Sequence, residues 1–215
     1  MKFTDPSDPI EMLIDVPSPI DLRLIGEATE WEATALLKRP WRTEFFAAFA
    51  AAIQSSPVTV NRVLELGSGP GFLADYLLQA MPTVTYVALD FSAAMHQLAF
   101  QRLGALTSRV RFVERSFKEP SWSQGLGPFE AITTHQAVHE LRHKRYALEL
   151  HSQAKELLAE GGKYLVCDHY VGEGGMKNDQ LYMTVAEQRE ALIGAGFSRV
   201  ELLLLKGGLV LHSAS

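Results

Sequence analysis

The most informative segment of this sequence is Val63-Leu64-Glu65-Leu66-Gly67-Ser68-Gly69-Pro70-Gly71, where an apolar strand leads into three glycines at alternate positions. An apolar helical pattern begins directly after it, at Phe72. Glycine lets a backbone approach a ligand closely because it has no Cβ, and open α/β sheets bind ligands at the carboxyl ends of their strands. The segment therefore predicts a strand–turn–helix unit with a ligand site at its turn.

Two acidic residues near this turn indicate what kind of ligand it takes. Glu65 lies inside the strand, where a carboxylate is costly unless it has a partner. Asp90 ends the next predicted strand, where an acid can accept hydrogen bonds from both hydroxyls of a ribose. The dinucleotide fingerprint G-x-G-x-x-G would need glycine where this chain has Phe72, so an NAD-dependent oxidoreductase is kept only as an alternative.

On both sides of this segment, short apolar runs alternate with helical patterns. Strands are expected at 62–66, 84–90, 110–113, 129–133, 163–168, 200–205 and 209–212, and helices at 72–81, 92–103, 143–160 and 184–194. This alternation predicts an α/β, Rossmann-like fold: a mostly parallel seven-stranded sheet with helices on both faces and a C-terminal antiparallel hairpin. Residues 1–57 are expected to form an N-terminal arm with helices at 21–37 and 41–54 that cover the site, and residues 58–215 the ligand-binding domain.

Composition excludes several classes of protein. The chain has 215 residues, of which 47% are hydrophobic and 21% charged, as in an ordinary globular domain. No apolar run approaches the ~20 residues that cross a bilayer, and the acidic N-terminus does not resemble a secretory signal. The single cysteine, Cys167, lies in an apolar strand and is expected in the core of a cytoplasmic protein. The net charge of −5 argues against a nucleic-acid partner.

These motifs, in this order, resemble the class I S-adenosylmethionine-dependent methyltransferases over roughly residues 58–215. The resemblance implies that S-adenosylmethionine is the cofactor and that its methionine part is wrapped by a matching motif, here Glu65, Gly67, Ser68, Gly69 and Gly71. It also implies that Asp90 binds the ribose, that Phe91 lies beside the adenine, and that His135, at the end of the fourth strand, contacts the cofactor near its methyl group.

One cofactor contact of the family is matched less closely. After the strand at 110–113, many members carry an acid that faces the adenine amino group, whereas this chain has Ser116 followed by Phe117. The Ser116 hydroxyl or the Phe117 backbone can take over that contact. The alternative is that Ser116 is an ordinary loop residue.

Methyl transfer is an in-line displacement, so the protein must mainly align the reacting atoms, and an oxygen nucleophile also needs a nearby base. The candidates follow the fourth and fifth strands: His139 or His169 in the acceptor pocket, oriented by Asp168 or Glu140. The alternative for each histidine is that its side chain is packed in the fold or solvated and takes no part in catalysis. Histidines at 135, 139 and 143 would share one face of a helix, but residues 133–135 are expected to end a strand, so no metal site is predicted.

Two further segments are candidates for the acceptor pocket. Trp41 and Arg42, just before the core, are assigned to it, with Arg39 or Arg42 meeting a carboxylate; the alternative for Trp41 is packing between arm and core. The polar, glycine-rich stretch 172–180 is expected to form a mobile lid. The predicted function is methyl transfer to a small-molecule acceptor, and the alternative is a protein that binds the cofactor without catalysis.

Overall fold

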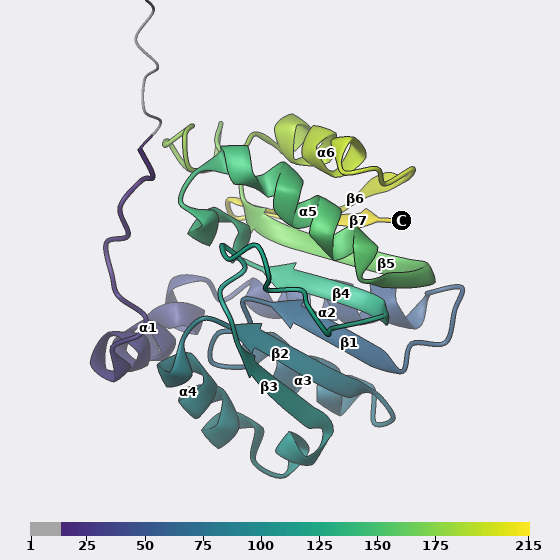
Figure 1. The fold of residues 1–215 in the computed structure, drawn as a ribbon. Coiled ribbons are helices and arrows are strands. Elements are labelled where there is room, and N and C mark those ends of the chain that lie inside the picture. The colour runs from purple at the N-terminus through teal and green to yellow at the C-terminus, as the bar shows by residue number, and fades with distance from the viewer. Residues whose placement is uncertain (1–13) are drawn as a thin grey trace, which may run out of the picture.

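A seven-stranded sheet organises residues 14–215, the part of the chain that the computed structural model describes (Figure 1). The elements in chain order are α1 (Ile25–Lys38), α2 (Arg42–Gln54), β1 (Arg62–Leu66), α3 (Phe72–Ala80), β2 (Thr85–Asp90), α4 (Ala93–Leu103), η1 (Gly104–Arg109), β3 (Val110–Glu114), β4 (Phe129–His135), η2 (Val138–Leu141), η3 (Lys144–Tyr146), α5 (Ala147–Glu156), β5 (Leu158–His169), α6 (Val185–Gly194), β6 (Val200–Lys206) and β7 (Leu209–Ala214).

The strand order is β3-β2-β1-β4-β5-β7-β6, parallel from β3 to β5 and antiparallel at β7 and β6. This confirms the predicted mostly parallel sheet with a closing hairpin. The order reverses between β1 and β4, and a ligand crevice opens at such a point in an open α/β sheet. The segment that begins at Val63 therefore leads directly into this crevice.

Each face of the sheet has its own apolar core, which explains why the parallel strands read as continuous apolar runs. On one face α2 and α3 pack against the sheet, with Phe45, Phe49 and Leu77 fully buried. On the other face α5 and α6 cover the sheet around Trp122 and Phe129. Cys167 lies in the first core with no exposed surface, which confirms it as a core residue. The expected division of the chain into an arm, residues 1–57, and a ligand-binding domain, residues 58–215, stays a prediction. Helix α2 of the arm and strand β1 of the domain contribute to the same core.

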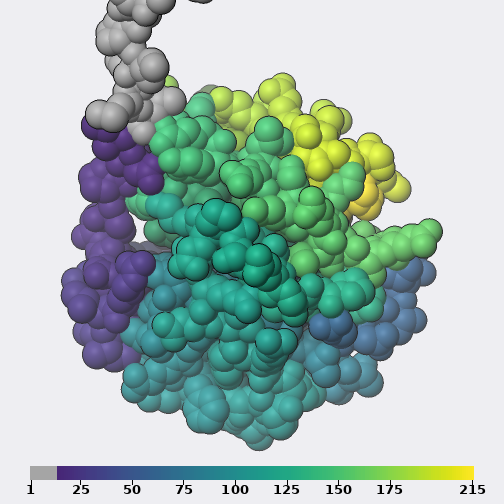
Figure 2. All heavy atoms as spheres, in the orientation of Figure 1, coloured from purple at the N-terminus to yellow at the C-terminus, as the bar shows by residue number. Residues whose placement is uncertain are grey.

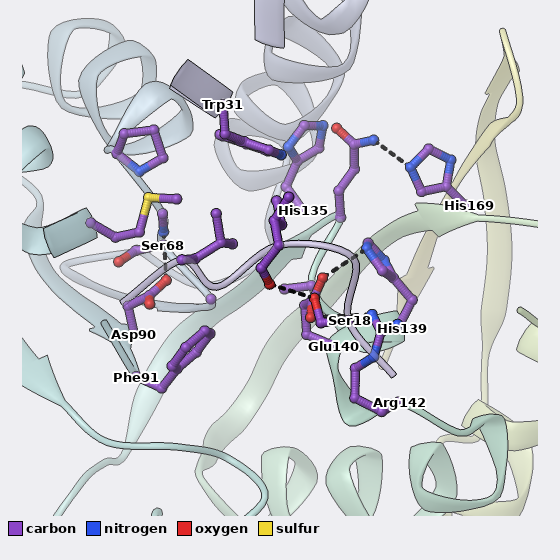
Figure 3. Close-up of a pocket in the computed structure, with 18 of the residues that line it drawn as sticks. Ser18, Trp31, Ser68, Asp90, Phe91, His135, His139, Glu140, Arg142 and His169 are labelled. Carbon is purple, nitrogen blue, oxygen red and sulfur yellow. Dashed lines mark hydrogen bonds and ion pairs between the residues drawn. The ribbon is translucent and has the colours of Figure 1, made fainter. Parts of the chain in front are cut away.

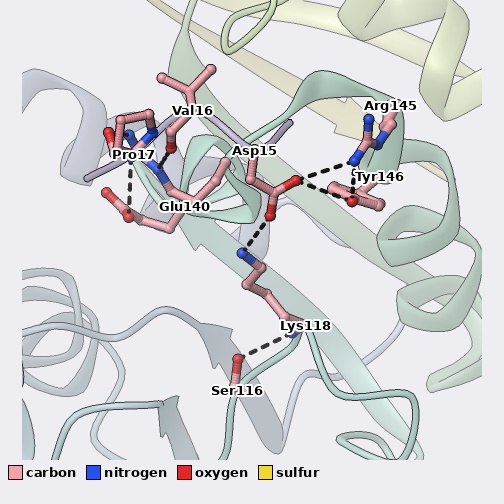
Figure 4. Close-up of polar contacts among 9 residues, drawn as sticks. Asp15, Val16, Pro17, Ser116, Lys118, Glu140, Arg145 and Tyr146 are labelled. Carbon is pink, nitrogen blue, oxygen red and sulfur yellow. Dashed lines mark hydrogen bonds and ion pairs between the residues drawn. The ribbon is translucent and has the colours of Figure 1, made fainter. Parts of the chain in front are cut away.

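An extended segment, residues 14–24, crosses the sheet edge where the parallel strands end; we call it the strap (Figures 1 and 2). The backbone N–H of Val16 donates to the Arg142 carbonyl, and the Arg142 side chain donates to the carbonyls of Val16 and Pro17. The Asp15 carboxylate accepts from Lys118 and Arg145 at 3.1 and 3.2 Å (Figure 4). The strap is therefore fixed at its start to loops that follow β3 and β4.

Four of the six predicted helices begin within one residue of the expected start, and α1 begins four residues later than expected, at Ile25. Ser92 caps α4 as expected, since its Oγ accepts from the backbone N–H of Met95 at 3.1 Å. The predicted helix over 143–160 is wrong at both ends: a 3-10 turn precedes α5, and β5 already begins at Leu158. The reason is a register shift, in which Phe129 pairs with Leu158 but Ala131 pairs with Lys163. Gly161 and Gly162 thus interrupt a strand instead of ending a helix.

No helix within residues 14–215 combines the length and the apolar character that spanning a membrane requires.

Candidate active site

A cavity of about 620 Å³ lies at the sheet edge where the strand order reverses, a typical size for a small-molecule site (Figure 3). The glycine turn after β1 and the end of β2 form one side. The ends of β4 and β5, with the loops that follow them, form the other. The strap and α1 roof the cavity, and Ser18 and Trp31 line it from these two segments.

The glycine turn lines the cavity with backbone alone. Gly67, Gly69 and Gly71 all have positive φ, at 69°, 53° and 79°. A Cβ on Gly67 would lie 2.3 Å from the Cβ of Ala137, whereas a Cβ on Gly69 would meet no atom within 4 Å. The Ser68 hydroxyl lines the cavity and is buried without a hydrogen-bond partner among residues 14–215. The turn therefore leaves open space and a free hydroxyl where a ligand would bind.

Substituting the two glycines separately distinguishes folding from ligand binding. Gly69→Ala should lower the Tm by only a few degrees, because the left-handed backbone costs about 1–2 kcal/mol and nothing clashes. Its methyl group would occupy cavity space and weaken ligand binding by about tenfold or more. Gly67→Ala should instead lower the Tm strongly through its clash with Ala137. Melting curves and titration with S-adenosylhomocysteine check both variants. Equal Tm losses for Gly69→Ala and Gly67→Ala would contradict the geometry.

Asp90 holds the turn in place. Its Oδ2 accepts from the backbone N–H of Gly69 at 2.8 Å and its Oδ1 from that of Ser92 at 2.9 Å. Burial raises the pKa of Asp90 to about 6 although these bonds act in the opposite direction, so the group is ionised at neutral pH. An ionised carboxylate with lone pairs left over at the rim of the cavity suits vicinal hydroxyls.

The apolar end of the cavity lies next to Asp90. Phe91 and Phe117 line it from the loops that follow β2 and β3, and Leu22 closes it from the strap. Ser116 lines a smaller adjoining cavity, and its Oγ accepts from the backbone N–H of Lys118 at 3.2 Å. A flat, apolar ring would fit between these side chains.

Glu65 has the partner that a buried carboxylate needs. It is 2% exposed, and the Tyr86 hydroxyl donates to its Oε2 at 2.8 Å. Burial raises the pKa of Glu65 to about 8, against the effect of the Tyr86 hydrogen bond, and the charge of Asp90 raises it further. Glu65 is therefore mostly uncharged at neutral pH.

This raised pKa predicts a pH-dependent gain in stability from Glu65→Gln. Because the folded pKa is above the unfolded one, Glu65 stabilises the fold fully below about pH 4.5, and this contribution is lost as pH rises through 8. Glutamine cannot ionise, so the variant should match wild type at pH 5 and have the higher Tm at pH 8. Melting curves at both pH values check this, with exposed Glu160→Gln as control. A Tm difference that is the same at both pH values would contradict it.

At the other side of the cavity, His139 and Asp168 form a buried ion pair. His139 Nδ1 lies 2.7 Å from Asp168 Oδ1, and the backbone N–H of His139 donates to Oδ2 at 2.9 Å. Its Nε2 lies 3.4 Å from Glu140 Oε1. Burial alone would lower the pKa of His139, but the charge and hydrogen bond of Asp168, together with Glu140, raise it to about 10. His139 is thus a cation at neutral pH.

His169 lies beside this pair and has the opposite protonation state. The two imidazole rings are 5.4 Å apart, and the Gln136 amide nitrogen donates to His169 Nε2 at 2.8 Å. His169 Nδ1 has no partner among residues 14–215. Burial lowers the pKa of His169 to about 4, and the positive charge of His139 lowers it further, so His169 is neutral. Gln136 has a φ of 57°, a strained backbone that places its amide at the cavity.

His135 ends β4 and also lines the cavity. Its ring packs edge-on against Phe46 and Phe49, with centroids 5.2 and 6.0 Å away. Burial lowers its pKa to about 3, and the nearby Arg42 lowers it further. His135 lies in a strand and His139 in a 3-10 turn, so they do not share a helix face. Within residues 14–215, no cluster of His, Cys, Asp or Glu side chains has an arrangement that would hold a metal ion.

The arm residues divide between cavity and core. Arg42 lines the cavity, but Trp41 does not, which corrects its assignment to the acceptor pocket. Trp41 packs against the β6–β7 turn, where a Cβ on Gly207 would lie 2.3 Å from its Cε2 atom. Two aromatic side chains of the arm do line the cavity, Phe46 of α2 and Trp31 of α1, and the sequence interpretation assigned neither to it. For Trp31, the spacing of three residues from buried Ala28 was the available signal.

The glycine-rich segment that follows β5 lies at the mouth of the cavity. Met176 and Asn178 line the cavity, and Tyr182 lies next to both His139 and His169, 5.6 and 5.7 Å from their rings. A bridge between Val171 and Met176 turns the segment back on itself. Its role as a mobile lid stays a prediction.

Residues 64–164 match a family model described as a methyltransferase domain. A malonyl-[acyl-carrier protein] O-methyltransferase of Paenibacillus sp. (strain JDR-2) is 26% identical over 136 residues, which cover 63% of this chain and 48% of the relative. The chain thus spans about half the length of that curated relative.

Solved structures share the fold. A DhpI–SAH complex has a TM-score of 0.69 at 20% identity, covering 89% of this chain and 92% of its own. Human N-acetylserotonin methyltransferase in complex with SAM has a TM-score of 0.69 at 17% identity, covering 90% and 56%. Residues 64–164 therefore match a methyltransferase-domain family, and the chain shares the Rossmann-like class I fold of these S-adenosylmethionine-dependent methyltransferase structures.

Proposed function

We propose that this protein transfers the methyl group of S-adenosylmethionine to a small-molecule acceptor. The observation that carries the proposal is one continuous cavity with the glycine turn and Asp90 at one end and His139 and His169 at the other. The residues present fit the cofactor. Gly69 leaves open space, Ser68 Oγ and His135 Nε2 are buried without partners among residues 14–215, and Asp90 is placed for a ribose.

When bound, S-adenosylmethionine supplies an electrophilic methyl group on a positively charged sulfur. The chain's part is to hold the cofactor in one orientation: the turn over Gly67–Gly71 binds the amino-acid tail, Asp90 accepts from the ribose hydroxyls, and Phe91 packs on the adenine. Holding both reactants in line supplies most of the catalysis, because it removes the entropy cost of their meeting. The strap and α1 line the same space.

His169 is the residue that we assign to accept a proton from an acceptor hydroxyl. It is neutral at pH 7 because burial lowers its pKa to about 4. The lone pair that can take a proton is on Nε2, which accepts from the Gln136 amide, so the acceptor hydroxyl has to displace that amide to reach it. His139 already carries a proton, and its role is to hold Asp168 and the loop after β4 in place. An amine acceptor would need no base.

Calorimetry tests the cofactor assignment. We expect micromolar binding of S-adenosylhomocysteine and none of NAD; the reverse would favour an oxidoreductase. Turnover against a panel of acceptors then separates an enzyme from a protein that only binds the cofactor. Acyl-carrier-linked acids belong in this panel, since the curated relative is named for such a substrate.

The role of the arm and the cellular location of the protein are part of the same proposal. The arm, residues 1–57, covers the site, and the strap and α1 within it support this because both line the cavity. We also propose a cytoplasmic location, supported by the single cysteine, Cys167, which is buried and free.

A further inference from the structure

Arg42 is a buried cation whose partner is missing. It is 3% exposed and lines the cavity. Within residues 14–215, its Nε has no hydrogen-bond partner and no carboxylate forms an ion pair with its guanidinium. Its one ring contact is with Trp31, whose centroid lies 5.3 Å from the guanidinium carbon. A buried charge without a counterion is destabilising, so proteins keep one where a ligand supplies the opposite charge.

The other arginines around the fold show how unusual this is. Arg102 pairs with Glu32 and Arg142 with Glu140, and Arg109 donates to three backbone carbonyls. Arg39, the second arginine at the cavity, is only half-buried and likewise forms no ion pair with a residue in 14–215. Two neighbouring cations on one wall of the cavity thus have no anionic partner in the described part of the chain.

None of the acids in or beside the cavity forms an ion pair with Arg39 or Arg42, and each has other partners. Asp168 pairs with His139, and Glu140 lies between His139 and Arg142. Asp90 accepts from two backbone N–H groups. Glu65 is bonded to Tyr86 and mostly uncharged at neutral pH. Within residues 14–215 no acid is left to pair with these arginines, which points to a ligand as the source of the negative charge.

We propose that Arg39 and Arg42 form a subsite that binds a carboxylate group, carried by the methyl acceptor or by the amino-acid tail of the cofactor. The proposal rests on the proposed function and deepens it. An arginine side chain binds a carboxylate through two parallel N–H donors, which matches the planar geometry of the group. The tail of S-adenosylmethionine also carries an ammonium and lies next to a sulfonium, so a wall with two cations favours an acidic acceptor as the source.

The source is tested by comparing ligands that differ in their charge. S-adenosylhomocysteine has the carboxylate tail, and 5′-methylthioadenosine lacks it. If the acceptor carries the carboxylate, the affinities of Arg42→Gln for S-adenosylhomocysteine and 5′-methylthioadenosine stay within twofold of the wild-type values. Matched pairs of an acid and its amide, malonate with malonamide and benzoate with benzamide, are then added to protein loaded with S-adenosylhomocysteine. At least one acid should bind about tenfold or more tighter than its amide, and Arg42→Gln or Arg39→Gln should remove this preference.

If the cofactor tail is the source, Arg42→Gln weakens S-adenosylhomocysteine about tenfold or more and leaves 5′-methylthioadenosine unchanged. Either pattern supports a carboxylate subsite. The proposal is overturned if the wild type prefers no acid over its amide and Arg42→Gln does not change the ratio of the two nucleoside affinities. No binding of S-adenosylhomocysteine to wild type would instead overturn the proposed function.

Two variants show that the effect is not a folding defect. Arg42→Lys keeps the charge but loses the paired donors, so it should fold and still lose most of the acid preference. Arg189→Gln, at an exposed position of α6, should leave every affinity unchanged. Because the unpaired charge destabilises the free protein, Arg42→Gln should not lower its Tm. A Tm loss of more than about 10 °C would assign Arg42 a structural role and overturn the proposal.

Discussion

Asn in place of Asp90 should lower the affinity for S-adenosylhomocysteine by roughly a hundredfold, about 3 kcal/mol. Asn keeps the size of Asp90 but has one acceptor oxygen where the carboxylate has two. Both carboxylate oxygens already hold the turn through Gly69 and Ser92. The variant cannot satisfy those donors and accept from a ribose at the same time. Calorimetric titration measures the loss, and melting curves confirm that the variant is folded.

Glu114→Gln is the matched control for this variant. Glu114 of β3 lies opposite Asp90 of β2 in the strand register, and its side chain is exposed, so removing its charge should not change the affinity for S-adenosylhomocysteine. Since the pKa of Asp90 is about 6, wild-type affinity should also fall as pH drops from 7 to 5, whereas Asp90→Asn should lose this component of the pH dependence. Unchanged binding by Asp90→Asn at pH 7 would remove the assignment of Asp90 to the ribose.

His169→Gln should reduce kcat for a hydroxyl acceptor by about a hundredfold or more, with little change in the affinity for S-adenosylhomocysteine. Glutamine can still bond to Gln136 but cannot accept a proton. His139→Gln should act differently: it leaves Asp168 buried without its cation, so the Tm should fall. Turnover and melting curves of the two variants separate proton acceptance from positioning. Full turnover in both variants would exclude both histidines from catalysis.

The pH profile of kcat, at saturating cofactor, distinguishes the two histidines independently. A base whose pKa is about 4 is available throughout the neutral range, so catalysis by His169 predicts a kcat that is flat between pH 5.5 and 8. A base whose pKa is about 10 is almost fully protonated there, so catalysis by His139 predicts a tenfold rise per pH unit. A rise of that slope would reverse the roles proposed here.

The architecture could be predicted from the sequence because it depends on short-range patterns. An apolar run that enters alternate glycines, as at Val63–Gly71, specifies a strand, a turn and a helix within a few residues. The alternation of strands and helices then specifies a mostly parallel sheet, whose geometry brings strand ends such as Asp90 and His135 to one edge. The end of α5 was missed because Gly161 and Gly162 interrupt a strand, and their role depends on the neighbouring β4.

The arrangement of side chains at the site was decided only by the tertiary structure. His139 and Asp168 are 29 residues apart, and the fold pairs them while leaving adjacent His169 neutral. Trp41 and Arg42 are neighbours in sequence, yet one packs against Gly207 and the other faces the cavity. Charge states and burial arise from groups brought together by packing, and a single sequence does not encode those distances locally. The type of fold and the cofactor turn thus follow from sequence, whereas the proton positions and the unpaired arginine follow from packing.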